Sequence, residues 1–330
     1  MKIGNLVIYR DNVRRLCGMI TGYTSPDRDP ELPPKKVEGD INLGADLSAS
    51  TRIGNIRENQ EDAVLIMKHK KNSKYKMMVI ADGVGGNESG EKASYICVNE
   101  IREWFNTLEE EDFKNEKYLI TQLVRKLDFV NARVNELGNG AATTFVCAIV
   151  TENHTFIINI GDSRAYILDG KRFGQISIED SLAQEYLNKG AIKTRDDMRF
   201  SKISNYVTNN LGGGRINVTP NIQQIDNDAY DAILLFSDGV TDCLSDDQIY
   251  AVTKWTSPRK LAQKLVKKAL KTTSRRAKKK SDKVSFYDEI PAGKDNTTAA
   301  VLVNKRKKGE SHDERWYSWD RRWKWNIKKV

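Results

Sequence analysis

The chain has 330 residues, of which 39% are hydrophobic and 30% are charged. This mixture fits one or two globular domains and excludes a wholly disordered chain. No apolar stretch approaches the roughly 20 residues needed to span a membrane. Four dispersed cysteines exclude a disulfide framework and a zinc-finger array. The N-terminus lacks the apolar run of a signal peptide, and we therefore expect a cytoplasmic protein.

The net charge of +9 is unevenly distributed along the chain. Residues 254–283 contain 13 Lys and Arg residues and one acid, and residues 305–330 contain 10 Lys and Arg residues and four acids. These two segments together carry +18, so the rest of the chain carries −9. An acidic body argues against nucleic-acid binding by the main surface and suits a site built from carboxylates and cations.

The chain divides into four predicted parts. Residues 1–24 form a small N-terminal β appendage, in which two apolar runs flank a turn signal at Asp11 and Asn12. Residues 25–40 hold four of the seven prolines and are predicted to be a linker. Residues 41–304 form the main domain, and residues 305–330 form a basic, Trp-rich tail.

Within the main domain, apolar patterning predicts both strands and helices. The predicted strands are residues 77–81, 143–151, 154–160, 164–168, 232–236 and 297–303, and the predicted helices are 89–107, 116–137 and one opening at Ser257 and Pro258. Gly138 is the expected C-terminal cap of the second helix. Helix pairs that alternate with hairpins favour an α+β layered domain over a βαβ series.

Aspartates that follow apolar runs or lie at turns are the most informative feature: Asp62, Asp82, Asp162, Asp238, Asp242 and Asp295. A carboxylate at the end of a buried strand is costly to desolvate unless cations or donors meet it. A shared metal cluster is the simplest solution, and the Gly83 carbonyl could be a further ligand. The three histidines are dispersed, so an all-oxygen site would select Mg²⁺ or Mn²⁺. Taken singly, each Asp-Gly is more typical of a simple turn.

The ordered motifs RENQED (57–62), IADGVGG (80–86), ATT (142–144), GDSR (161–164), SDGVTD (237–242) and DNTT (295–298) resemble the type 2C protein phosphatases, the metal-dependent PPM family. The resemblance covers about residues 44–303 and is to the bacterial version, in which no histidine follows the Asp-Gly pair. Residues 181–184, 190–192 and 209–212 resemble the family's flap region. Ser201 and Lys202 replace the usual His-Pro pair there, a departure that bears on flap geometry and substrate choice.

The resemblance implies a four-layer αββα sandwich, with two antiparallel sheets flanked by helices. It implies hydrolysis of phosphoserine and phosphothreonine in proteins by water activated by two Mn²⁺ or Mg²⁺ ions. In this family pattern Asp82 bridges both ions, the Gly83 carbonyl binds one ion, and Asp238 and Asp295 complete the other. Glu61 and Asp62 hold water ligands of the ions, and Asp162 and Asp242 hold a third, more weakly bound ion. Arg57 binds the substrate phosphate. Val84 stands where some relatives carry histidine, so water from the metal centre is the expected acid for the leaving group.

Two other functions stay open at this point. The fold could serve as a catalytically weak or inactive binding module, although every principal metal aspartate is present. The Trp-rich tail could instead carry the main function as a scaffold. A cysteine-based phosphatase is excluded, because no cysteine is followed by an arginine six positions downstream.

The basic segments allow several interpretations. Residues 271–283 are predicted to be a solvated loop, with a docking patch for acidic or phosphorylated partners as the alternative. In the tail, Trp316, Trp319, Trp323 and Ile327 share one helical face. That face could pack on the protein itself, anchor to a membrane, or stack on nucleic acid. The expected partners are phosphoproteins that are targets of a serine/threonine kinase in the same cell.

Overall fold

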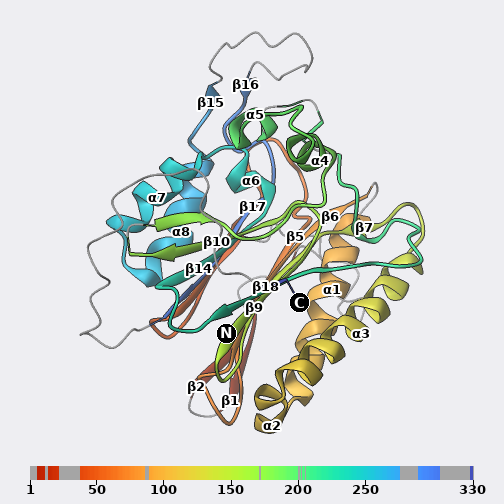
Figure 1. Cartoon of the computed structure of the whole chain (residues 1–330), viewed down its shortest axis with the longest axis vertical. Helices are drawn as coiled ribbons and strands as arrows, with labels where there is room; N and C mark the ends of the chain where they lie inside the picture. Colours follow the sequence, from red (N-terminus) through yellow and green to blue (C-terminus); the bar gives the residue numbers. More distant parts are fainter. Residues whose placement is uncertain are drawn as a thin grey trace, which may run out of the picture.

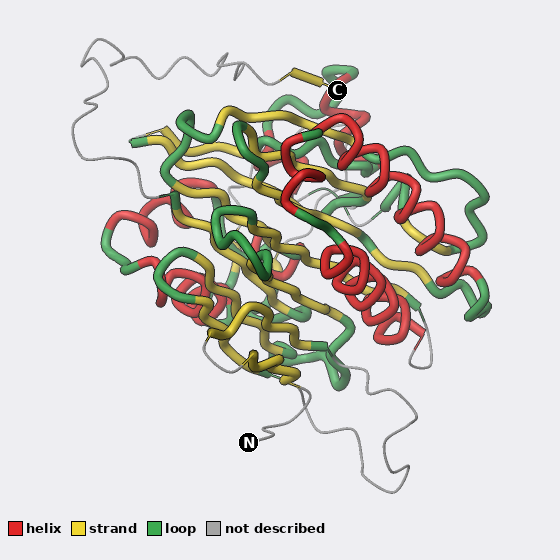
Figure 2. Tube along the Cα trace, turned by 90° about the horizontal axis from the view of Figure 1, so that it is seen from below, coloured by secondary structure: helices red, strands yellow, loops and turns green. Residues whose placement is uncertain are grey.

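Two antiparallel sheets stack face to face, and helices cover their outer faces (Figure 1). The computed structural model describes residues 6–11, 14–21, 38–85, 89–170, 172–199, 201, 203–204, 206–275, 289–304 and 328–329. Figure 2, turned by 90°, shows the long helices on one side of the strands and shorter helices on the other. This arrangement confirms the predicted αββα sandwich. In the described part of the chain, no helix is long and apolar enough to cross a membrane.

The larger sheet has ten strands. Its main path runs β1 (Leu6–Asp11), β2 (Arg14–Ile20), β5 (Asp62–Lys68), β6 (Lys76–Val84), β8 (Phe145–Val150), β9 (His154–Ile160), β13 (Asn221–Asp226) and β18 (Lys328–Lys329), with β7 (Ala142–Thr143) and β12 (Leu211–Gly212) attached beside β6. The β1–β2 hairpin was predicted from the sequence, but its place was not. It extends the larger sheet, because β2 pairs with β5 and buries Cys17, Met19 and Ile20.

The second sheet has six strands, in the order β11 (Arg172–Gln175), β10 (Arg164–Asp169), β14 (Ala232–Phe236), β17 (Thr297–Val303), β4 (Leu47–Arg52) and β3 (Gly39–Leu43). A separate two-stranded ribbon joins β15 (Ser274–Arg275) and β16 (Glu289–Ile290). The strands of both large sheets carry long buried apolar runs because each sheet is covered on both faces.

Helices form the outer layers. On the larger sheet lie α1 (Ser89–Thr107), α2 (Glu110–Lys114) and α3 (Glu116–Asn135); near the second sheet lie α6 (Asp238–Thr241), α7 (Asp246–Lys254) and α8 (Pro258–Ala269); α4 (Leu182–Asn188) and α5 (Arg195–Arg199) belong to the flap region. Three main apolar clusters fill the spaces between successive layers. Such burial, at about 25 cal/mol per Å² of apolar surface, is the main force holding the layers together.

Helix α1 has the predicted bounds, and α3 ends two residues earlier than predicted. Gly138, just beyond α3, has the expected left-handed φ of 66°. The predicted strand 143–151 is divided at Thr144. The Thr144 N–H donates to the Asp82 carbonyl in the register of the β6 ladder, but the Asp82 N–H donates to the Thr144 hydroxyl at 3.0 Å instead of to its carbonyl. The predicted tail helix lies in residues that the structure does not describe, apart from Lys328 and Lys329 in β18.

Candidate active site

Strand ends from both sheets meet at one end of the sandwich. Asp62 begins β5 and pairs in register with Asp82 of β6. Asp238 follows β14 as the first residue of α6, and Asp295 precedes β17, which pairs with β14. The strand order therefore brings four carboxylates, far apart in sequence, into one electrostatic environment.

Burial and mutual repulsion strongly perturb these acids. Desolvation, followed by the charges of Asp62, Asp238 and Asp295, raises the pKa of Asp82 well above its ordinary range. Desolvation and the charge of Asp295 do the same to the pKa of Asp238. Burial raises the pKa of Asp62 to about 7, although two hydroxyl groups oppose the shift. Perturbed carboxylates that gather in this way are typical of functional sites.

Asp62 is held rigidly but is only half satisfied. Its Oδ2 accepts hydrogen bonds from Ser237 Oγ at 2.8 Å and from Thr298 Oγ1 at 2.5 Å. Its Oδ1 is buried and has no hydrogen-bond partner among the described residues. Asp238 Oδ1 is buried and unpartnered in the same way. Buried carboxylate oxygens without donors are suitable ligands for a hard divalent cation.

The donor set therefore fits Mg²⁺ or Mn²⁺ in its chemistry. No three His, Cys, Asp or Glu side chains within the described ranges converge as a complete set of metal ligands. The charges of these acids influence one another's pKa values, but the side chains do not close around one point. The assignment of individual ligands to individual ions consequently stays a prediction.

Arg57 lies at the exposed edge of the cluster. Its Nη2 contacts Asp295 Oδ2 at 2.7 Å and its Nη1 contacts Glu61 Oε2 at 3.4 Å, while 46% of the side chain is exposed. Burial raises the pKa of Glu61, against the opposing charge of Arg57. A planar guanidinium oriented by two acids and open to solvent is well suited to binding a phosphate.

Asn296 positions the loop that carries Arg57, and the sequence analysis did not single it out. Its Nδ2 donates to the carbonyls of Ile53 and Asn59, and its Oδ1 accepts from the Glu61 N–H at 2.8 Å. The position next to Asp295 in the DNTT motif was the available signal. A buried amide that satisfies three backbone groups fixes the loop relative to β17.

Gly83 permits close packing beside Asp82. A Cβ at this position would lie 2.1 Å from the Gly90 carbonyl oxygen, and the Gly83 N–H donates to the Glu61 carbonyl at 3.1 Å. The start of α1 can therefore approach β6 only because residue 83 is glycine. Val84 follows at the exposed end of β6.

Asp162 and Asp242 lie next to the main cluster and influence the pKa of Asp238. Desolvation and the nearby Glu179 raise the pKa of Asp162 to about 7. Beside them, Arg164 and Glu179 form a buried ion pair at 2.7 Å, with side chains 7% and 2% exposed. The two predicted acids of the third metal site are thus close to the principal ones.

Asp180, which the sequence analysis also missed, connects the flap region to this area. Its carboxylate accepts from the Gly161 N–H, from Asn209 Nδ2 and from Asn221 Nδ2 at 2.8–3.1 Å. It therefore joins the residue before Asp162 to the segment that leaves the flap and to the first residue of β13.

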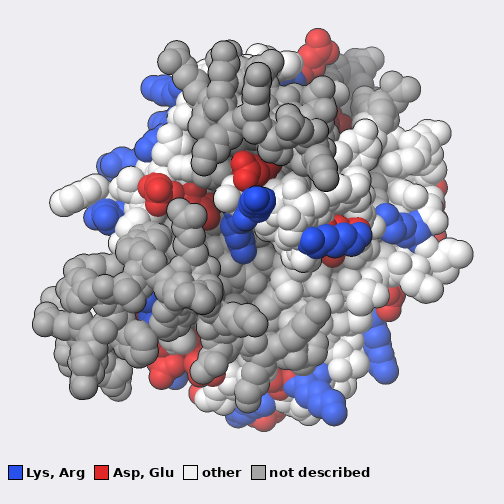
Figure 3. Space-filling model, turned by 45° about the horizontal axis from the view of Figure 1, so that its top comes forward, with Lys and Arg blue, Asp and Glu red and all other residues white. Residues whose placement is uncertain are grey.

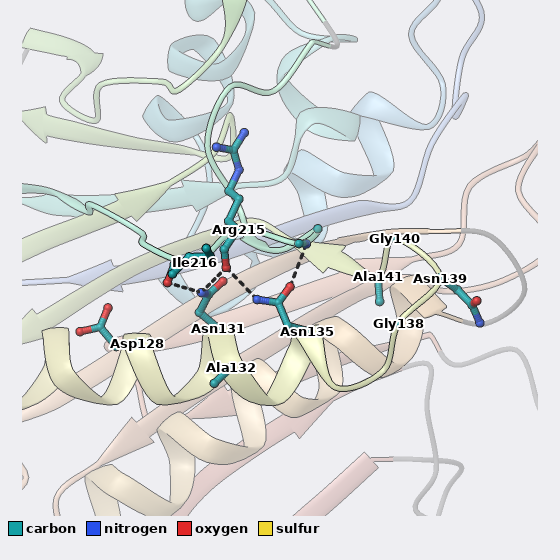
Figure 4. A pocket seen from close by; sticks show the side chains of 12 residues that line it. Asp128, Asn131, Ala132, Asn135, Gly138, Asn139, Gly140, Ala141, Arg215 and Ile216 are labelled. Carbon is teal, nitrogen blue, oxygen red and sulfur yellow. Dashed lines mark hydrogen bonds between the residues drawn. The ribbon is translucent and has the colours of Figure 1, made fainter.

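A hollow in the described surface lies away from this site. It has a volume of about 620 Å³ and lies between α3 and the loop 213–216 (Figure 4). Asn131 and Asn135 point into it, and their amides bind the Arg215 carbonyl at 2.9 and 2.7 Å. None of the predicted site residues lines it, and its amides are already engaged in holding the loop.

Comparisons with known proteins agree with this arrangement. The chain is 30% identical over 219 residues to the serine/threonine phosphatase stp of Listeria welshimeri, covering 64% of this chain and 83% of that protein. It is 27% identical over 225 residues to the protein phosphatase PhpP of Streptococcus pneumoniae, covering 62% and 82%. A crystal structure of a bacterial serine phosphatase matches with a TM-score of 0.66 at 26% identity, covering 80% of this chain and 99% of that one.

Two further matches extend the comparison. The catalytic domain of the phosphatase PstP, whose structure holds two manganese ions, shares the fold with a TM-score of 0.60 at 23% identity, covering 78% and 96%. Residues 55–280, more than half of the chain, match the family described as Protein phosphatase 2C. This span contains the Arg57 loop and every clustered acid except Asp295, and the chain belongs to the protein phosphatase 2C family.

Proposed function

We propose that this protein hydrolyses phosphoserine and phosphothreonine in other proteins and needs Mn²⁺ or Mg²⁺ to do so. The observation that carries the proposal is the cluster of acids with raised pKa values beside the exposed Arg57. The names of its relatives as serine/threonine phosphatases support the same substrate class.

The metal ligands in this proposal are oxygen groups of the cluster. Asp82, the Gly83 carbonyl, Asp238 and Asp295 would bind two ions, Glu61 and Asp62 would support them through water, and Asp162 and Asp242 would hold a third. When bound, such ions lower the pKa of water and stabilise the charge on a transferring phosphoryl group. The manganese-containing PstP structure supports the choice of ion.

The chain itself supplies orientation. Asp295 and Glu61 hold the Arg57 guanidinium at the rim, from which its exposed face would bind the substrate phosphate. Ser237 and Thr298 fix Asp62 at the base of the site. Burial raises the pKa of each of the four cysteine thiols, so no thiolate nucleophile competes with water.

The test is hydrolysis of a phosphothreonine peptide with Mn²⁺, with EDTA, and by an Asp238→Ala variant. An Asp128→Ala variant on the exposed face of α3 is the matched control. We expect turnover that needs both the metal and Asp238 and is unchanged in the control. A folded protein without turnover under any condition would favour the inactive binding module instead.

The biological setting follows from the same chemistry. A phosphoprotein phosphatase opposes a kinase, and we propose that a serine/threonine kinase of the same cell supplies its substrates in the cytoplasm. Contact of the 305–330 tail with a membrane or a protein remains a separate prediction, which truncation of the tail would test in a vesicle co-sedimentation assay.

A further inference from the structure

Helix α8 presents two sharply different faces. Its apolar side, formed by Leu261, Ala262, Leu265, Val266 and Ala269, is buried against β4 and β17. On the opposite side, Lys260, Lys264, Lys267 and Lys271 follow one another at i, i+4, i+7 and i+11. This spacing places Lys260, Lys264 and Lys267 in one line along the helix, and Lys271 lies in the turn directly after it; the four are here called the lysine row. All four are exposed.

The lysine row has no local counter-charge. Residues 254–271 contain seven Lys and Arg residues and no acid. No described carboxylate forms an ion pair with the row. The nearby Asp40 is already engaged by Arg52 and by Gln263 of α8. In Figure 3 blue side chains gather along the left margin, the side on which Figure 1 places α7 and α8.

The lysine row leads toward the loop that carries Arg57. At its far end, the carbonyl of Pro258 accepts from Ser48 Oγ of β4. At its near end, the Leu270 carbonyl accepts from Asn55 Nδ2 at 3.2 Å, and the Asn55 N–H donates to Gly293 at 2.7 Å. Asn55 is two residues from Arg57, so the end of the row adjoins the loop that carries the phosphate-binding arginine.

We propose that the lysine row binds an acidic stretch of the phosphoprotein substrate while Arg57 binds its phosphate. The proposal rests on the function proposed above and adds a substrate preference to it. The helical part of the row, from Lys260 to Lys267, rises about 10 Å, the length of about three residues of extended peptide, and Lys271 extends the row by one turn. Four exposed ammonium groups over that distance match a short run of Asp, Glu or phosphorylated residues.

A membrane surface fits these observations less well. Interfacial helices bind through apolar side chains that enter the lipid, whereas α8 turns its apolar side inward. Trp255, 86% exposed, is the one large apolar side chain in residues 254–271 that stands out from the surface, and it precedes the row rather than interrupting it. The connection to the Arg57 loop favours a ligand that enters the active site.

The experiment compares phosphothreonine peptides that differ only in charge. In one peptide, a Gly-Ser spacer followed by five Glu residues stands on either side of the phosphothreonine. In its partner peptide, five Gln residues replace the five Glu residues. The row variant is Lys260→Gln, Lys264→Gln, Lys267→Gln. The control variant, Lys74→Gln, Lys117→Gln, Arg125→Gln, removes the same charge from exposed positions on the larger-sheet side.

We expect kcat/KM for the Glu peptide to fall about tenfold in the row variant, mainly through KM, because exposed ion pairs are individually weak and act together. The Gln peptide and the control variant should show no change. The Glu-peptide preference should also shrink as salt rises from low to 0.5 M, because screening shortens the range of the interaction.

Other outcomes are distinguishable. Equal kcat/KM for both peptides in the unmodified protein, or equal losses in the row and control variants, would overturn the docking proposal while leaving the phosphatase intact. If no peptide is hydrolysed, the proposed function fails, and fluorescence anisotropy of the labelled Glu peptide still tests whether the row binds it. Row-dependent binding to anionic vesicles without a peptide preference would assign this surface to membranes and refute the proposal.

Discussion

The buried acid Asp62 should make the metal-free protein less stable as pH rises. Its pKa is about 7 in the folded protein, whereas an Asp in an unfolded chain has a pKa of about 4. At a pH between about 4 and 7, Asp62 is protonated in the folded protein and ionised in the unfolded chain. Raising the pH through this window therefore favours unfolding, and the penalty is fully present above pH 7.

The replacement Asp62→Asn should remove this penalty. A difference of about three pKa units corresponds to about 4 kcal/mol at most. An amide oxygen accepts weaker hydrogen bonds from Ser237 and Thr298 than a carboxylate does, so we expect a net gain of about 2 kcal/mol. For a domain of this size that gain raises Tm by about 4–8 °C.

The assay is thermal unfolding in EDTA at pH 8 and at the lowest pH at which the protein remains folded, with Asp128→Asn as the control. We expect the variant to be more stable at pH 8 and the difference to shrink toward pH 4. With excess Mn²⁺ the order should reverse, because an ion that binds the native carboxylates stabilises the parent more. A variant less stable than the parent in EDTA at pH 8 would refute the reasoning.

Three further substitutions test other parts of the site. Arg57→Lys loses the two-pronged contact with phosphate, so kcat/KM should fall about 10- to 100-fold, and unchanged kinetics would remove Arg57 from that role. Gly83→Ala forces a methyl group against the Gly90 carbonyl, so urea unfolding should show a loss of about 1–3 kcal/mol, and native stability would contradict the packing. Glu179→Gln removes the carboxylate that pairs directly with buried Arg164 and leaves only the charges of Asp162 and Asp242 near it, so it should cost up to about 3–5 kcal/mol, which an added Arg164→Met change should partly restore.

Local patterns in the sequence predicted individual helices and strands better than they predicted which strands pair with each other. Apolar periodicity placed α1 correctly because the pattern and the helix have the same 3.6-residue period. The strand β5, helix α7 and the pairing of β2 with β5 were not predicted. Short apolar runs are ambiguous, and strand pairing depends on residues distant in sequence.

The candidate site shows the same limit. The motifs identified the acids, because carboxylates after apolar runs need an explanation wherever they occur. Asn296 and Asp180 were missed because their roles arise from contacts with backbone groups of other segments. Such roles depend on tertiary contacts between segments that are distant in the sequence.

The contacts divide the site into a fixed base and an open rim. Hydroxyl groups at the end of β14 and in β17 hold Asp62, and no solvent reaches it, so this acid cannot turn away from its neighbours. Arg57 instead stands at the rim, tied to Asp295 but nearly half exposed. The buried acids at the bottom of the site repel one another and lower the stability of the folded protein, so bound cations must stabilise them. Arg57 at the rim can instead release Asp295 and bind an incoming phosphate. The division explains why metal binding should change the stability of this protein while loss of Arg57 should change mainly its kinetics.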